Sequence, residues 1–160
     1  MELLNELLEL TDEFRQQEVP YAICGGLAMA VHGVPRATQD IDLLIPEDYL
    51  TRALEVAKTR GFWLPAGPMP LKARTPLATS VHRVSKAMGS YLIPLDLILV
   101  SPSLQQVWDG RLEGKIGDRH LTVVSRDGLI EMKRIAGRHR DLDDIERLTE
   151  SSNDEPSDVS

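Results

Sequence analysis

The sequence predicts an α+β fold, in which a small mixed α/β sheet is flanked by helices. In some segments apolar residues recur at helical spacing, as they do on one face of an amphipathic helix. Other segments are short apolar runs bounded by glycine or proline, which is typical of strands. The two kinds of segment alternate along the chain without an internal repeat, and this order favours helices packed on a mixed sheet.

The first half of the chain is expected to contain three helices and two strands. Leu3, Leu7 and Phe14 recur at helical spacing in an amphipathic segment that Pro20 ends. Glycine and proline delimit the segments that follow. In order, we expect a helix at 2–17, a strand at 21–24, a short helix at 27–31, a strand at 40–45 and a helix at 47–60.

The second half is expected to begin with a loop, because residues 65–76 contain four prolines and one glycine. Ser125 or Asp127 is expected to cap a helix that Gly137 ends. In order, we expect strands at 81–84 and 91–100, a helix opened by Pro102, a strand at 121–124, a helix at 125–136 and a last amphipathic helix at 141–148.

The composition is that of one globular domain. A length of 160 residues suits a single core, and 42% hydrophobic with 27% charged residues is ordinary for such a chain. No apolar run approaches the ~20 residues that a membrane-spanning helix needs, and the N-terminus lacks the basic start of a secretory signal. Cys24 is the single cysteine, so disulfide frameworks and multi-cysteine zinc sites are excluded. We therefore expect a cytoplasmic protein without membrane contact.

The acidic charge is unevenly distributed. The chain has 18 Lys+Arg against 25 Asp+Glu, a net charge of -7, and four of the acids lie in residues 149–160, which carry no base. Such a segment cannot bury enough apolar surface to offset its ordering entropy, so we expect a disordered acidic tail at 149–160 and one domain at 1–148. Without the tail, the chain has 18 bases and 21 acids, a net charge of -3. A charge this close to zero does not exclude a substrate that carries phosphate.

Asp40 and Asp42 are the first candidate metal ligands. Side chains alternate along a strand, so both carboxylates are expected on one face of the strand 40–45. Carboxylate oxygens favour Mg²⁺ or Mn²⁺ over zinc. The alternative is that one acid is a strand-edge charge facing solvent. A cation would relieve the repulsion between two carboxylates on a half-buried strand, and this favours the metal site.

Asp96 lies in a still more apolar setting, the run 91–100. An ionised carboxylate in a buried strand costs several kcal/mol unless it is paired or bound to a metal. The alternative is an edge position near Pro94 that faces water. If the strands 40–45 and 91–100 pair, Asp96 becomes the neighbour of Asp40 and Asp42.

Gly25-Gly26 follows an apolar strand and precedes a short helix. Glycines at such a place let backbone N–H groups approach a ligand closely, which suits a phosphate chain. A glycine pair alone is more often a simple turn. Together with Asp40, Asp42 and Asp96, however, it indicates a phosphate cradle beside a two-metal site for phosphoryl or nucleotidyl displacement.

These motifs together resemble the polymerase-β-like nucleotidyltransferase superfamily. The family pattern is a hydrophobic residue with Gly-Gly, a spacer, Asp-hydrophobic-Asp, and a later Asp between hydrophobics, and it is matched at 24–26, 40–43 and 95–97. Within the superfamily the chain is similar to minimal nucleotidyltransferases related to AbiEii-type toxins. A downstream Lys…Arg…Asp-x-x-Asp segment of these proteins is matched by Lys133, Arg138, Asp141 and Asp144. The resemblance covers residues from about 19 to 148.

The resemblance implies a role for ten residues. Asp40, Asp42 and Asp96 would be the catalytic metal ligands for Mg²⁺ or Mn²⁺, and Asp96 would also help deprotonate the acceptor. The nucleotide-binding residues would be Gly25, Gly26, Arg36, Thr38, Lys133, Arg138 and Asp141. One departure is Arg140, which stands where many AbiEii-like proteins carry a lysine. Arginine keeps the charge but cannot act as a base.

By the same resemblance, the expected function is metal-dependent transfer of a nucleoside monophosphate from an NTP to a hydroxyl. The acceptor would be an RNA (tRNA) end, a protein or a small molecule, with an RNA end as the first expectation. The chain would be the toxin of a toxin–antitoxin or phage-defence system, with an antitoxin partner. The alternatives are a catalytically inactive nucleotide-binding or partner-binding regulatory module and, ranked last, a phosphatase or nuclease. The oligomeric state stays open.

Two weaker interpretations concern residues outside these motifs. Lys72, Arg74, Arg83 and Lys86 are expected to form a positive strip beside the active site that guides RNA or nucleotide. Trp63 and Trp108 are expected in the core, because with only 4% aromatic residues the sequence gives little support to base stacking.

Overall fold

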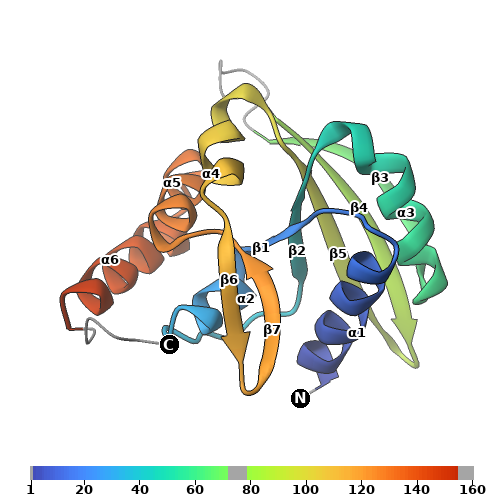
Figure 1. Cartoon of the computed structure of the whole chain (residues 1–160), viewed down its shortest axis with the longest axis horizontal. Helices are drawn as coiled ribbons and strands as arrows, with labels where there is room; N and C mark the ends of the chain where they lie inside the picture. The colour runs from blue at the N-terminus through green and yellow to red at the C-terminus, as the bar shows by residue number, and fades with distance from the viewer. Residues whose placement is uncertain (1, 72–78, 155–160) are drawn as a thin grey trace.

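The computed structural model describes residues 2–71 and 79–154, which form one mixed sheet with helices on both faces (Figure 1). The helical segments are α1 (Glu2–Gln16), α2 (Gly25–Val31), η1 (Glu47–Tyr49), α3 (Leu50–Thr59), η2 (Pro102–Leu104), α4 (Gln105–Asp109), α5 (Arg126–Ala136) and α6 (His139–Asp154). The strands are β1 (Ala22–Cys24), β2 (Ile41–Ile45), β3 (Phe62–Leu71), β4 (Thr79–Met88), β5 (Tyr91–Leu99), β6 (Leu112–Ile116) and β7 (Arg119–Val123). The predicted α+β class is confirmed.

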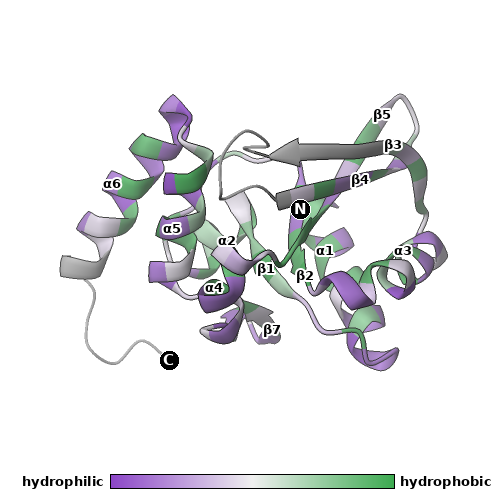
Figure 2. Cartoon of the chain, turned by 90° about the horizontal axis from the view of Figure 1, so that it is seen from above, coloured by the Kyte–Doolittle hydropathy of each residue, from purple (hydrophilic) through white to green (hydrophobic). Residues whose placement is uncertain are grey.

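The seven strands follow the order β3-β4-β5-β2-β1-β7-β6. The pairs β2–β5 and β1–β7 are parallel, and the other neighbours are antiparallel. The central strands β1 and β2 consist almost entirely of apolar residues, as Figure 2 shows by colour. Such strands are buried on both faces of a sheet, so a charged residue within them needs a special environment.

Helices α1 and α3 cover one face of the sheet. Lys86 of β4 donates a hydrogen bond to Glu6 of α1, at 2.8 Å, and Gly61 at the end of α3 lies against the same lysine side chain. Because Lys86 lies two residues beyond Val84, which is paired with Leu95 of β5, the three side chains share a face. The core between this face and the helices includes Leu7, Leu10, Phe14, Leu43, Leu95 and Leu97.

The opposite face carries the polar residues of β2, β4 and β5. Asp42, Arg83 and Asp96 project from this face, and α2 and α5 pack on the same side. Ser125 caps α5 by accepting a hydrogen bond from the N–H of Gly128, and α5 ends where Gly137 adopts a left-handed conformation (φ 64°). The predicted ends of this helix are confirmed.

The expected loop at 65–76 is wrong for its first part. Residues 65–71 belong to β3, which pairs with β4 and forms one edge of the sheet. An edge strand needs hydrogen bonds on one side only, so it tolerates prolines that a central strand would not. Residues 72–76 lie outside the described residues, as do Lys72 and Arg74 of the predicted positive strip. Trp63, expected in the core, is 56% exposed on this edge strand.

The sequence did not predict β6, the other edge strand. Its residues LEGKI are mostly exposed, so they lack the apolar alternation by which strands are recognised. Helix α6 continues to Asp154, so residues 149–154 extend a helix instead of belonging to the expected disordered tail. Residues 155–160 of that tail lie outside the described residues. Within the described ranges, no helix has the length and apolar character needed to cross a membrane.

Candidate active site

Asp42 and Asp96 lie side by side on neighbouring strands. The parallel register of β2 and β5 pairs them directly, and Asp40 lies two residues earlier, immediately before β2. Arg83 of β4 lies opposite Asp96 in the next register and donates two hydrogen bonds to it, from Nε to Oδ1 at 2.7 Å and from Nη2 to Oδ2 at 2.9 Å. The same guanidinium lies 3.7 Å from Oδ2 of Asp40. The three carboxylates expected at one site therefore share one face with one arginine.

The surroundings of the Asp42 carboxyl disfavour its ionised form. Burial, followed by the negative charges of Asp96 and Asp40, raises its pKa from 3.8 to about 7, although Lys133 and Arg138 act in the opposite direction. No described residue donates a hydrogen bond to this carboxyl group. A strongly perturbed carboxylate with specific charged neighbours is typical of a functional site.

Gly25 and Gly26 bring the backbone close to two side chains of the site. Gly25 has φ +68°, and a Cβ there would overlap Oδ2 of Asp42. A Cβ on Gly26 would come within 2.8 Å of Oγ1 of Thr38. Both positions therefore require glycine for close approach, and the first also requires it for its backbone conformation. The turn between β1 and α2 thus lies directly against the carboxylate of Asp42.

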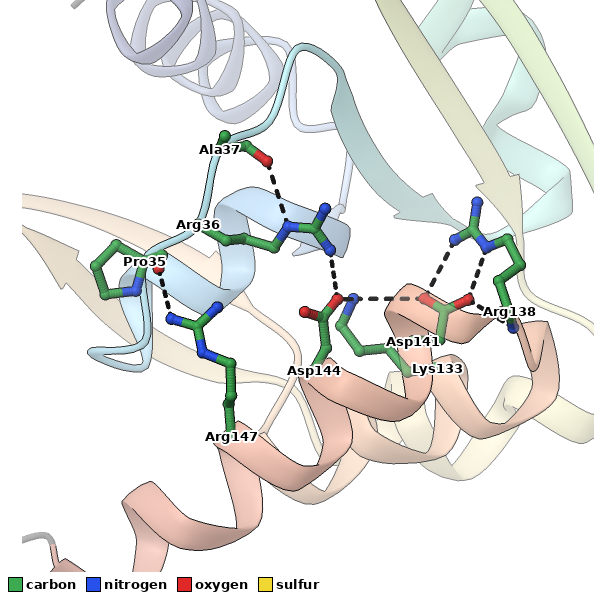
Figure 3. Close-up of polar contacts among 8 residues, drawn as sticks. All are labelled: Pro35, Arg36, Ala37, Lys133, Arg138, Asp141, Asp144 and Arg147. Atoms are coloured by element: carbon green, nitrogen blue, oxygen red, sulfur yellow. Dashed lines mark hydrogen bonds and ion pairs between the residues drawn. The ribbon is translucent and has the colours of Figure 1, made fainter.

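A network of ionic contacts ties the C-terminal helices to the loop before β2 (Figure 3). Buried Lys133 of α5 donates to Oδ2 of Asp144 at 2.9 Å, and Nη1 of Arg36 donates to the same oxygen at 2.5 Å. Lys133 also lies 3.7 Å from Oδ1 of Asp141. Arg138 donates to Oδ2 of Asp141 from its backbone N–H at 3.1 Å and from Nε at 2.6 Å.

This network holds three cationic side chains, Lys133, Arg36 and Arg138, next to the site. The hydrogen bonds that Arg138 donates to the Asp141 carboxylate raise the pKa of Arg138, so this guanidinium stays charged. Two aspartates thereby hold three cations: Asp144 contacts Lys133 and Arg36, and Asp141 contacts Arg138. The Lys133–Asp144 pair is buried on both sides, so it fixes the position of the Lys133 ammonium group, whereas the Arg138 side chain is 57% exposed.

Two adjacent cavities contain all ten predicted site residues. The larger, of about 590 Å³, is lined by nine of them, namely Gly25, Gly26, Arg36, Thr38, Asp40, Asp42, Lys133, Arg138 and Asp141, together with Ala37, Gln39 and Arg140. The smaller, of about 160 Å³, adds Asp96 and shares Gly25, Asp42, Lys133, Arg138 and Asp141 with the larger. The structure thus brings the predicted residues together, whereas their chemical roles stay predictions.

The carboxylate oxygens of Asp40, Asp42 and Asp96 suit a hard divalent cation, but the three carboxylates do not all face one another. Among the described residues, no group of three or more His, Cys, Asp or Glu side chains is arranged to hold a metal ion. The oxygens of Asp96 are taken by Arg83, whereas Asp42 and Asp40 keep carboxylate oxygens without a hydrogen-bond donor in the described part of the chain. Carboxylate oxygens are the ligands that Mg²⁺ and Mn²⁺ prefer, and the raised pKa of Asp42 marks a position that a cation would stabilise.

Sequence reasoning missed two features of the site. The sequence predicts Arg83 only as part of a positive strip, because its pairing with Asp96 depends on a strand register that sequence spacing does not reveal. The sequence indicates Asp144 only as part of the downstream motif, although this residue contacts both Lys133 and Arg36 in the structure. The three-residue spacing between Asp141 and Asp144 was the available signal, since it puts both on one face of a helix.

Comparison with known proteins identifies the fold. No family model matches the sequence, and no curated protein does. The lincosamide antibiotic adenylyltransferase LnuA, bound to lincomycin, is similar with a TM-score of 0.62 and 16% identity over 91% of this chain and 95% of that one. ANT(2")-Ia in complex with adenylyl-2"-tobramycin is similar with a TM-score of 0.55 and 15% identity, over 89% and 85% of the two chains.

A third solved structure, a candidate nucleotidyltransferase from Thermotoga maritima, has a TM-score of 0.61 and 15% identity over 96% of this chain and 94% of that one. At such identities the likeness establishes the fold. The chain has the nucleotidyltransferase fold.

Proposed function

We propose that this protein is a metal-dependent nucleotidyltransferase that moves a nucleoside monophosphate from an NTP to a hydroxyl acceptor. The observation that carries the proposal is the direct pairing of Asp42 with Asp96, beside the close turn at Gly25-Gly26 and facing the smaller cavity, which Lys133 and Arg138 also line. The structural likeness to proteins named as adenylyltransferases supports nucleotide transfer as the reaction type.

The larger cavity is the proposed nucleotide site. Its volume of about 590 Å³ and its polar lining suit a nucleotide. The backbone at Gly25-Gly26 would lie along the phosphates, and Arg36, Lys133 and Arg138 would offset their negative charge. Thr38 lies against Gly26, so its hydroxyl would border the same phosphates.

Asp40, Asp42 and Asp96 are the proposed ligands of Mg²⁺ or Mn²⁺. When bound, the metal would offset charge on the phosphates and stabilise the entering and leaving oxygens. Arg83 would have to release at least one oxygen of Asp96 for this carboxylate to take part, and the two strands already hold Asp96 next to Asp42. Asp96 would accept the proton of the acceptor hydroxyl.

The toxin role is a finer proposal that rests on the AbiEii-like motifs of the sequence alone. In that role the protein would act in the cytoplasm of a bacterium and would be neutralised by an antitoxin partner. Expression in a bacterial host tests it: growth arrest by the intact chain but not by Asp42→Ala supports a toxin. Normal growth, together with transferase activity in vitro, would exclude it.

Labelled-nucleotide transfer tests the main proposal. The purified protein is incubated with each α-labelled NTP, Mg²⁺ and, in separate reactions, total RNA, protein extract and small-molecule extract. We expect label to enter one acceptor class only with metal present, and to be lost in Asp42→Ala with an unchanged far-UV spectrum. Tight NTP binding without transfer would instead identify a regulatory module, and metal-dependent hydrolysis without a labelled acceptor would identify a phosphatase or nuclease.

A further inference from the structure

Asp96 differs from the other two aspartates of the site because its charge is already paired. Arg83 lies opposite it in the β4–β5 register and donates to both of its oxygens, from Nε at 2.7 Å and from Nη2 at 2.9 Å. The planar guanidinium fork matches the two carboxylate oxygens, so the geometry of the pair is fixed as well as its charge. Because Asp96 is only 7% exposed, other cations can reach these oxygens only by displacing Arg83.

The positive charge of Arg83 is permanent. The hydrogen bonds that it donates to Asp96 raise the pKa of Arg83, and a guanidinium is already charged at any physiological pH. Its Nη2 also lies 3.7 Å from Oδ2 of Asp40, which is too long for a hydrogen bond but close enough for electrostatic attraction. Arg83 is therefore a built-in cation of the site, in contact with Asp96 and close to Asp40.

Asp40 and Asp42 keep carboxylate oxygens to which no described residue donates a hydrogen bond. The two residues lie two positions apart along the chain, so both project from the face of the sheet that carries the site. Their charges repel each other, and this repulsion helps to raise the pKa of Asp42. A cation between them would remove the repulsion.

The other cations near the aspartates are held by other carboxylates. Lys133 donates to Asp144 at 2.9 Å, and Arg138 donates to Asp141 at 2.6 Å (Figure 3). Their charges act on Asp42 and lower its pKa, but burial and the neighbouring acids outweigh them. Asp42 therefore still lacks a cation in contact with it.

The charges of the site balance with one divalent cation. The three aspartates carry three negative charges when ionised and Arg83 carries one positive charge, so two negative charges remain. One divalent cation cancels them. A second divalent cation would leave two excess positive charges in a largely buried place, and it would have to break the pair between Arg83 and Asp96. Both changes cost free energy.

We propose that Arg83 takes the place of one metal ion, so that the protein without nucleotide binds a single divalent cation, which Asp40 and Asp42 hold. This inference rests on the metal site of the proposed function, and it differs from the two-metal site that the sequence motifs indicate. Asp96 stays paired with Arg83 in this state. The phosphates of a bound NTP would favour release of Asp96, because they offer the guanidinium another anionic partner.

Mn²⁺ binding counts the cations. Free Mn²⁺ gives a sharp EPR signal that bound Mn²⁺ loses, so titration of the full chain without nucleotide gives the number of sites. KCl at about 0.15 M screens weak binding to exposed acids. We expect one site in the wild type and two in Arg83→Gln, which frees both oxygens of Asp96. Two sites in the wild type, or one in folded Arg83→Gln, would overturn the proposal.

Three further variants separate the role of Arg83 from a general effect of charge. Arg83→Lys keeps the cation and should bind one Mn²⁺. Arg134→Gln removes the same charge from an exposed pair with Glu131 and should also bind one. The double variant Arg83→Gln/Asp96→Asn should return to one site, because the carboxylate of the second site is lost. A second site in any of the three would overturn the proposal.

The stability of Arg83→Gln gives a second measurement. The substitution leaves the buried Asp96 carboxylate without its partner, so urea should unfold this variant at a lower concentration than the wild type in EDTA. Mn²⁺ should raise the midpoint of Arg83→Gln more than that of the wild type, because the second cation replaces the guanidinium. If the variant is unfolded in EDTA, Mn²⁺ should refold it. A variant that Mn²⁺ does not stabilise would contradict the role of Arg83.

Measuring nucleotidyl transfer separately keeps the two proposals distinguishable. One site in the wild type and two in Arg83→Gln, in a chain that transfers no label, would support the role of Arg83 and refute nucleotidyl transfer. Two sites in a wild type that transfers label would support nucleotidyl transfer and refute the role of Arg83. Absence of Mn²⁺ binding in both proteins would refute the metal site and the role of Arg83 together.

Discussion

Asp42 and Asp96 lie directly opposite each other on the parallel strands β2 and β5, but only Asp96 has a cationic partner in contact with it. Arg83 donates two hydrogen bonds to Asp96, whereas no described residue donates one to Asp42. The pKa of Asp42 is accordingly raised to about 7 by burial and by its acidic neighbours. The pair is thus asymmetric, with one neutralised carboxylate and one that lacks a counter-charge in contact.

Asp42→Asn is expected to stabilise the metal-free protein while abolishing its activity. The substitution removes the buried like charge, so the free energy of unfolding at pH 8 in EDTA should rise by about 1–2 kcal/mol. Nucleotidyl transfer should fall by at least ~100-fold, because a metal ligand is lost. Urea unfolding with EDTA or with Mg²⁺ measures both states: Mg²⁺ should raise the stability of the wild type and not that of the variant. An equal Mg²⁺ effect in both proteins would contradict the assignment of Asp42 as a ligand.

Gly25→Ala is expected to cost more than an alanine substitution at a comparable glycine. Gly25 and Gly89 have similar φ angles, +68° and +60°, so backbone strain of about 1–3 kcal/mol applies to both. Only at Gly25 would the new Cβ overlap Asp42, whereas a Cβ on Gly89 has no atom within 4 Å. Gly25→Ala should therefore lose activity and unfold at lower urea than Gly89→Ala, which should keep full activity. Equal midpoints and activities would show that the close approach is not required.

The sequence predicted the centre of the sheet better than its edges. Apart from Asp42 and Asp96, strands β1, β2 and β5 consist almost entirely of apolar residues, so their segments could be recognised without knowledge of the neighbouring strands. The sequence did not predict the edge segments β3 and β6 as strands. Prolines in β3 indicated a loop, and the exposed residues of β6 carried no apolar pattern, because an edge strand need not be buried on both faces.

In the candidate site, too, the sequence could identify some residues and not others. Residues that a local motif contains, such as Gly25 and Asp42, could be named from spacing alone. The contacts of Arg83 and Asp144 depend on which strands and helices become neighbours, so spacing could not assign them. The sequence also does not reveal the apolar lining of the smaller cavity. Leu129 and Met132 have the spacing of ordinary core positions in an amphipathic helix.

Asp144→Asn is expected to weaken nucleotide binding more than it slows chemistry. The change removes the charge that holds both Lys133 and Arg36, so these cations should lose their fixed positions. We expect KM for the NTP to rise about tenfold, equivalent to about 1.4 kcal/mol, with kcat reduced less than threefold. Glu131→Gln is the matched control, because Glu131 pairs with Arg134 on the exposed surface and should leave KM unchanged. A fall in kcat with an unchanged KM would contradict the positioning role of Asp144.

Asp141 is expected to make the stability of the protein depend on acidic pH. Burial opposes ionisation of this carboxyl, but the hydrogen bonds and charge of Arg138, with help from Lys133, outweigh it and hold the pKa of Asp141 below its usual value. A carboxyl whose pKa is lower in the folded state stabilises that state above the unfolded pKa of about 3.9, and the contribution is lost as the pH falls through the lowered value.

The difference in unfolding free energy between wild type and Asp141→Asn should therefore be largest at pH 7 and should shrink as the pH falls from about 5 towards 3. Urea unfolding at a series of pH values measures this difference, and subtracting the two curves removes the titrations that both proteins share. Asp143→Asn, a change at an exposed neighbour on the same helix, should give a difference close to zero throughout. A wild-type advantage over Asp141→Asn that stays constant from pH 7 to pH 3 would mean that the ionised form of Asp141 does not stabilise the fold.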